Sequence, residues 1–82
     1  MIYPAYRKLA NENNFYCIHS ENHFEEIMII GHKYSILQFE AKIYPDKMRI
    51  QDMLNDPNVF LHSSPAEYQA IKEKCQEELV LV

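Results

Sequence analysis

The chain has 82 residues, of which 48% are hydrophobic, and it contains a single glycine and no tryptophan. This length excludes two ordinary domains and the apolar fraction excludes a disordered chain, so we expect one domain over residues 1–82 with a thin core. The formal net charge is −4, with six basic and six acidic side chains in residues 1–49 but two and six in residues 50–82. An acidic chain without a Lys/Arg cluster lacks the charge that phosphate binding requires, so direct nucleic-acid binding is disfavoured.

The first two segments predict a helix and a strand. Pro4 suits the first turn of a helix, and apolar residues recur after it at helical spacing, which predicts a helix over residues 4–13. The next segment is rich in aromatic and branched residues, which is typical of a strand over residues 15–19. On such a strand Phe15, Cys17 and His19 share one face.

Residues 24–30 and 34–43 flank the dipeptide Gly31-His32, which predicts a β-hairpin with glycine at the first central position of its turn. The spacing of Ile27, Ile30 and Tyr34 also fits one long helix across residues 22–43. The glycine and the density of branched and aromatic residues favour the two strands.

The last third predicts a short helix over residues 46–54, a short strand over residues 59–62 and a second main helix. The start of that helix has the clearest local signal, because Ser64 suits the N-cap, Pro65 the first helical position and Glu67 the third. Its apolar face consists of Tyr68, Ile71, Cys75 and Leu79, and the apolar residues 80–82 follow it.

These elements predict an α+β fold: a small, mostly antiparallel sheet of three or four strands, with two main helices and one short helix. We expect all helices to lie on one face of the sheet. The longest apolar runs, such as residues 27–30, have only four residues, so no membrane span is expected.

Few residues of the sequence suggest a catalytic, phosphate-binding or metal-binding site. The single glycine excludes glycine-rich phosphate loops, and adjacent carboxylates such as Glu25 and Glu26 diverge on a strand, so we expect them to be solvated charges. Cys17, His19 and His23 are the only local group of metal-ligand residue types, but their spacing matches no zinc motif. The sequence therefore predicts no catalytic site and no cofactor, although a metal-stabilised domain built on these three residues is an alternative.

The two cysteines, Cys17 and Cys75, lie far apart, and the first residues show no signal-peptide pattern. We therefore expect two free thiols and a cytoplasmic location.

The leading hypothesis is a small acidic, non-enzymatic module that occupies a partner protein, as an inhibitor or immunity-type factor of a virus or mobile element does. Tyrosines serve as anchors at protein interfaces, and carboxylates steer association with a basic surface. The expected contact residues are Tyr16, Tyr34, Tyr44, Glu73, Glu77 and Glu78. A chain this small is also compatible with a homodimer. The alternative is binding of nucleotides or single-stranded nucleic acid, with bases stacked on Tyr16, Phe24 and Tyr34.

Overall fold

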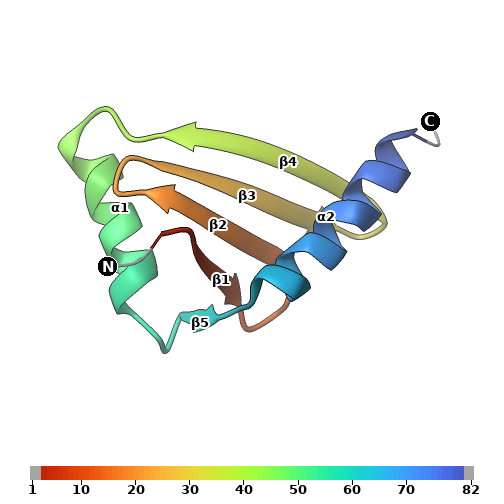
Figure 1. The fold of residues 1–82 in the computed structure, drawn as a ribbon, viewed down its shortest axis with the longest axis horizontal. Coiled ribbons are helices and arrows are strands. Elements are labelled where there is room, and N and C mark those ends of the chain that lie inside the picture. Colours follow the sequence, from red (N-terminus) through yellow and green to blue (C-terminus); the bar gives the residue numbers. More distant parts are fainter. Residues whose placement is uncertain (1–2, 81–82) are drawn as a thin grey trace.

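The computed structural model describes residues 3–80, with side chains as far as Gln76. Within these residues five strands and two helices follow in the order β1 (Ala5–Leu9), β2 (Asn14–Ser20), β3 (His23–Ile30), β4 (Lys33–Glu40), α1 (Tyr44–Asn55), β5 (Phe60–His62) and α2 (Pro65–Val80). The strands form one antiparallel sheet in the order β4-β3-β2-β1-β5 (Figure 1). The α+β class is confirmed, but the sheet has one strand more than the largest sheet predicted.

The extra strand is the segment predicted as the first helix, and that prediction is wrong. Ala5–Leu9 forms β1, which pairs with β2 on one side and β5 on the other. A tight turn leads from β1 to β2, in which Glu12 has a φ of 58° and its N–H donates to the carbonyl oxygen of Leu9 at 2.9 Å. Helix propensity is a weak preference, and pairing with two strands satisfies more backbone groups than an isolated short helix can.

The hairpin prediction for residues 24–43 is confirmed, and the long-helix alternative is wrong. Strands β3 and β4 pair from His23 with Glu40 to Ile30 with Lys33, leaving a two-residue turn. Gly31 in that turn has a φ of 61°, a conformation that glycine adopts without steric cost. Strand β4 is shorter than predicted because the chain leaves the sheet after Glu40.

Both predicted helices of the last third are present. The Oγ of Ser64 accepts a hydrogen bond from the Glu67 backbone N–H at 3.1 Å, which confirms the predicted N-cap of α2. The Glu67 carboxylate does not close a capping box but binds Lys8 at 2.9 Å, so α2 is tied to β1. Neither helix of the described residues is long and apolar enough to cross a membrane.

The two helices pack on opposite faces of the sheet, so the prediction that they share a face is wrong. The α1 face buries side chains of β2 and β3 against α1: Tyr16, Ile18, Phe24, Ile50, Met53 and Leu54. The α2 face buries the alternate side chains of the same strands against α2: Phe15, Cys17, Ile27, Tyr68 and Cys75. The central strands are apolar at both alternating sets of positions, so both of their faces require cover.

Each helix covers only one half of its face. On the α1 face, the covered half contains Phe24 and Phe39, near the β2–β3 turn. On the α2 face, the covered half contains Ile29 and Tyr34, near the β3–β4 turn. Figure 1 shows this arrangement, with α1 across one end of the sheet and α2 across the other. One half of each face is therefore left open, at opposite ends of the sheet.

Candidate functional site

Two adjacent carboxylates, Glu25 and Glu26, are buried on opposite faces of β3 with 5% and 4% exposure. The prediction that they are solvated is wrong, because the sheet is covered on both faces. The Glu25 carboxylate accepts hydrogen bonds from the Tyr68 hydroxyl at 2.6 Å, from Lys72 Nζ at 3.0 Å and from the side-chain amide of Gln38.

These bonds decide the protonation of Glu25. Burial alone raises the pKa of Glu25, but the hydrogen bonds from Tyr68, Lys72 and Gln38 outweigh burial and hold the pKa below its ordinary value. Burial and the Glu25 charge raise the pKa of the Tyr68 hydroxyl. The proton therefore stays on Tyr68 and the negative charge on Glu25.

On the other face, Glu26 ties α1 to the sheet. It accepts a hydrogen bond from Asn14 Nδ2 at 2.9 Å, and Arg49 of α1 lies 3.9 Å away. The Arg49 guanidinium also lies over the rings of Phe24 and Phe39, at 5.6 and 5.7 Å from their centroids. These contacts combine charge pairing with cation–π attraction, and their role is structural.

A polar network extends from Glu25 across the open half of the α2 face. Because the Gln38 amide nitrogen donates to Glu25, its oxygen faces His23 Nε2 at 2.9 Å, and His23 must carry its proton there. The His23 ring stacks on His19 at 4.9 Å, and His19 Nδ1 lies 3.8 Å from Cys17 Sγ. The network thus brings together Cys17, His19 and His23, the three residues with metal-binding side chains that the sequence analysis grouped.

The geometry of this network favours neither a nucleophilic Cys17 thiolate nor a metal-binding site. Burial raises the pKa of the Cys17 thiol, with the Tyr6 hydroxyl opposing that effect, so the nucleophilic thiolate is disfavoured. Stacked rings at an interplanar angle of 26° do not converge their nitrogens on one point. Over the part of the chain that the structure describes, no group of three or more His, Cys, Asp or Glu side chains is placed to hold a metal ion. Both cysteines are free and buried.

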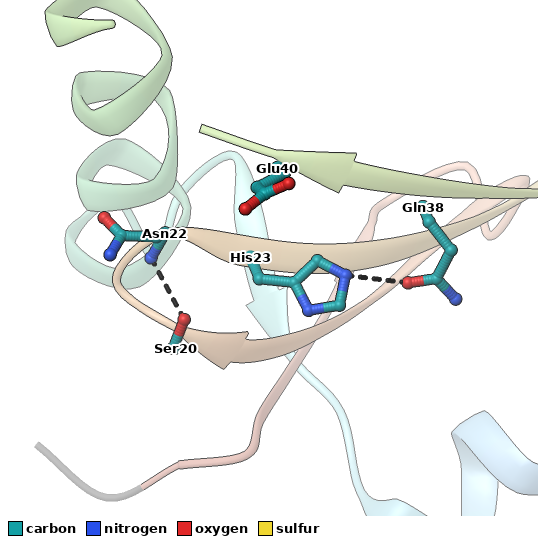
Figure 2. A pocket seen from close by; sticks show the side chains of 5 residues that line it. All are labelled: Ser20, Asn22, His23, Gln38 and Glu40. Carbon is teal, nitrogen blue, oxygen red and sulfur yellow. Dashed lines mark hydrogen bonds between the residues drawn. The ribbon is translucent and has the colours of Figure 1, made fainter. Parts of the chain in front are cut away.

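An open hollow of about 500 Å³ lies beside this network (Figure 2). Its lining is polar and comes from the β2–β3 turn and from β3 and β4: Ser20, Asn22, His23, Gln38 and Glu40. In Figure 2 the imidazole of His23 is held by Gln38, and Ser20 caps the backbone of Asn22. These bonds hold Ser20, His23 and Gln38 within the protein.

The structure separates the predicted contact residues. Tyr16 is buried on the α1 face, so it belongs to the core and not to a surface open to a partner. Tyr34 is half-buried on the α2 face, whereas Tyr44 is exposed at the start of α1. Glu73 is exposed on α2. The side chains of the other two predicted acidic contacts, Glu77 and Glu78, lie outside the described residues.

The aromatic stacking platform is likewise not assembled. Tyr16 and Phe24 are buried under α1, and Tyr34 lies on the opposite face of the sheet. Bases cannot stack on all three side chains from one side.

The outer edge of β4 is the surface that the sequence did not identify. Among the described residues, no strand pairs with this edge. Ile30 and Lys33 flank a two-residue turn and are hydrogen-bonded to each other, so alternate residues along β4 direct their backbone groups outward. These residues are Tyr34, Ile36, Gln38 and Glu40. The stretch from 34 to 39 contains no charge, proline or bulge, which are the usual protections of an edge strand.

Two groups of exposed apolar side chains lie near this edge, one on the α1 face of the sheet and one at the start of α1 itself. The hairpin patch consists of Ile30 and Leu37, which lie on the open half of that face. The helix patch consists of Ile43, Tyr44 and Met48, at the start of α1. Helix α1 begins just beyond the end of β4, so the helix patch lies at that end and the hairpin patch toward the other.

The described residues thus present a strand edge suited to pairing and, on the α2 face, an open hollow lined by polar residues. No family model, curated protein or solved structure matches the chain. Exposed main-chain groups next to exposed apolar side chains are the features by which a sheet edge binds a further strand.

Proposed function

We propose that this protein is a non-enzymatic protein-binding module that occupies a partner protein through the β4 edge. The observation that supports this proposal is the unprotected edge of β4, flanked on one face by exposed apolar side chains. Main-chain hydrogen bonds of an added strand supply affinity, and pockets between alternate side chains supply specificity. Leu37, which is 50% exposed beside this edge, is the proposed anchor.

The acidity of the chain adds an electrostatic component to the proposal. The net charge is −4, and exposed Glu73 lies on α2, the helix that crosses the sheet toward the β4 edge (Figure 1). Such charge increases the association rate with a basic partner and is screened by salt. Occlusion of a partner's surface by a small acidic protein is how an inhibitor or immunity-type factor acts.

An affinity pull-down with matched variants tests the proposal. The tagged chain, Leu37→Lys and Val59→Lys are each incubated with lysate of the natural cell or host at low and high salt. Val59 is a suitable control because it is 48% exposed and lies beside β5, at the opposite edge of the sheet. We expect a stoichiometric protein that wild type and Val59→Lys retain and that Leu37→Lys loses by about tenfold, which corresponds to about 1.4 kcal/mol.

Two results would overturn the proposal. Equal recovery of the partner by Leu37→Lys and wild type would exclude the β4 edge as the contact. Recovery of nucleic acid or a small ligand in place of protein would show that the chain is not a protein-binding module.

A further inference from the structure

We propose that the partner at the β4 edge is a second copy of this chain, which pairs antiparallel with the first to give one continuous sheet. This inference rests on the proposed function, because it names the occupant of the same edge. It replaces a basic partner with a copy that has the same net charge of −4, so self-association should strengthen as salt screens the repulsion. The inference is supported by the unpaired backbone groups along β4 and by the exposed apolar side chains near this edge.

The backbone of β4 is suited to pairing with itself. A two-fold axis perpendicular to the sheet, passing at Ile36 or Leu37, makes two β4 strands antiparallel and keeps like faces on the same side. With the axis at Leu37, the outward-facing groups of residues 34, 36, 38 and 40 all meet counterparts; with the axis at Ile36, those of residues 34, 36 and 38 do. In either register all but one end residue of each strand is paired.

The exposed apolar side chains fit the same arrangement. The hairpin patch lies on the face of the sheet that α1 packs against, and the helix patch lies at the start of α1, so the two patches are toward opposite ends of β4. Antiparallel pairing therefore brings the helix patch of one copy to the hairpin patch of the other. The two-fold axis repeats this contact, so a single self-complementary surface buries four patches.

The half-covered faces point to the same partner. On the α1 face, the helix of one copy lies beside the open half of the neighbouring copy, which contains Ile30 and Leu37. On the α2 face, α2 runs toward the β4 edge (Figure 1) and hence toward the neighbour's open half, where the hollow of Figure 2 is lined by His23 and Gln38. Both open halves gain a neighbour from one symmetry operation.

A second copy supplies a strand edge and both patches through symmetry alone, whereas an unrelated protein would have to match them independently. Small domains with thin cores also gain stability from a subunit contact. An unpaired edge strand has free backbone N–H and C=O groups that can bind another strand. Pairing with a second copy would satisfy these groups and prevent further strands from adding to the edge.

Sedimentation equilibrium over a range of concentrations tests the inference. We expect wild type and the control Val59→Lys to have twice the chain mass of 9.8 kDa, and Leu37→Lys to be a monomer with unchanged far-ultraviolet circular dichroism. Leu37→Glu alone should also be monomeric. An equimolar mixture of Leu37→Lys and Leu37→Glu should restore the dimer, because the two side chains approach each other across the two-fold axis.

Amide hydrogen exchange supplies a second measurement. In the dimer the outward amides of Tyr34, Ile36 and Gln38 should exchange as slowly as the inward amides of Ser35 and Leu37. In Leu37→Lys only the inward amides should remain protected, because the β3 pairing is intact.

The failures of the two proposals can be told apart. A monomeric wild type that binds another protein and loses it on Leu37→Lys would refute self-pairing and leave the protein-binding function standing. A dimer that survives in Leu37→Lys, with the outward amides unprotected, would refute self-pairing through β4. A monomer whose protein partner is unaffected by Leu37→Lys would refute both.

Discussion

Tyr68→Phe should test whether the buried charge of Glu25 is held by the hydroxyl from α2. The substitution keeps the ring that packs against Tyr6 and the α2-face core, and removes only the hydrogen bond of 2.6 Å to the carboxylate. Glu25 keeps Lys72 and Gln38 as partners. The measured loss should therefore be that of one charge-assisted hydrogen bond.

The magnitude follows from the burial of both groups. A hydrogen bond to a charged group contributes about 1.5–3 kcal/mol, and we expect a loss of about 2 kcal/mol because two donors remain. With a urea m-value of about 1 kcal/mol/M for a small protein, the unfolding midpoint should fall by about 2 M. Tyr44→Phe, at a hydroxyl on a side chain that is 74% exposed, is the matched control and should change stability by less than about 0.5 kcal/mol.

The effect of Tyr68→Phe on stability should depend on pH, because the hydroxyl stabilises only the charged form of Glu25. The pKa of Glu25 is lowered in the folded state, so its contribution to stability is fully present above the unfolded pKa of about 4.3 and is lost as the pH falls through the folded pKa. Tyr68→Phe raises that folded pKa toward its ordinary value. The difference in unfolding free energy between wild type and variant should therefore be constant above about pH 5 and shrink below about pH 4.

A double-mutant cycle with Glu25→Gln completes the test. The coupling between the two positions should be about 1 kcal/mol or more, since both groups belong to one buried network. A loss below about 0.5 kcal/mol in Tyr68→Phe, or the same loss at pH 7 and pH 3.5, would refute the reasoning that the hydroxyl stabilises a buried charge.

Two further predictions concern the cap of α2 and the thiols. Ser64→Ala should lower the free energy of unfolding by about 1 kcal/mol in urea denaturation, because the Glu67 N–H loses its acceptor. Ser64→Asp should restore most of that loss, since its carboxylate can accept the same hydrogen bond. Equal stability of Ser64→Ala and wild type would contradict the cap. Cys17 and Cys75 are buried with pKa values raised chiefly by burial, so a disulfide reagent at neutral pH should label the native chain at least about tenfold more slowly than the urea-unfolded chain. Either thiol reacting at the unfolded rate would count against its burial.

Several parts of the fold could be predicted because their signals are local. The N-cap of α2 is a hydrogen bond between residues three apart, Ser64 and Glu67, and both residue types are visible in the sequence. The turn at Gly31 needs a positive φ, which selects glycine. Strand β2 is dense in aromatic and branched residues whose alternate members fill two cores.

The candidate site was predicted less well. Both Tyr44 and Tyr16 were predicted as contact residues, but Tyr44 is exposed whereas Tyr16 lies in the core. Residue type alone does not predict whether a helix will cover a tyrosine side chain. The exposure of Leu37 beside the unpaired edge was also not visible, because alternation along a strand does not reveal whether that strand lies at an edge.

The sequence by itself determined the class of the fold, the hairpin, the start of α2 and the absence of a glycine-rich phosphate loop, because each depends on residues close together in the chain. Only the tertiary structure decided that Ala5–Leu9 is a strand, that the helices take opposite faces, that Glu25 is buried and that β4 has an open edge. Each of these depends on segments distant in the chain. The alternation of side chains shows which residues share a face, but the identity of the segment that covers the face is set by packing across the whole molecule.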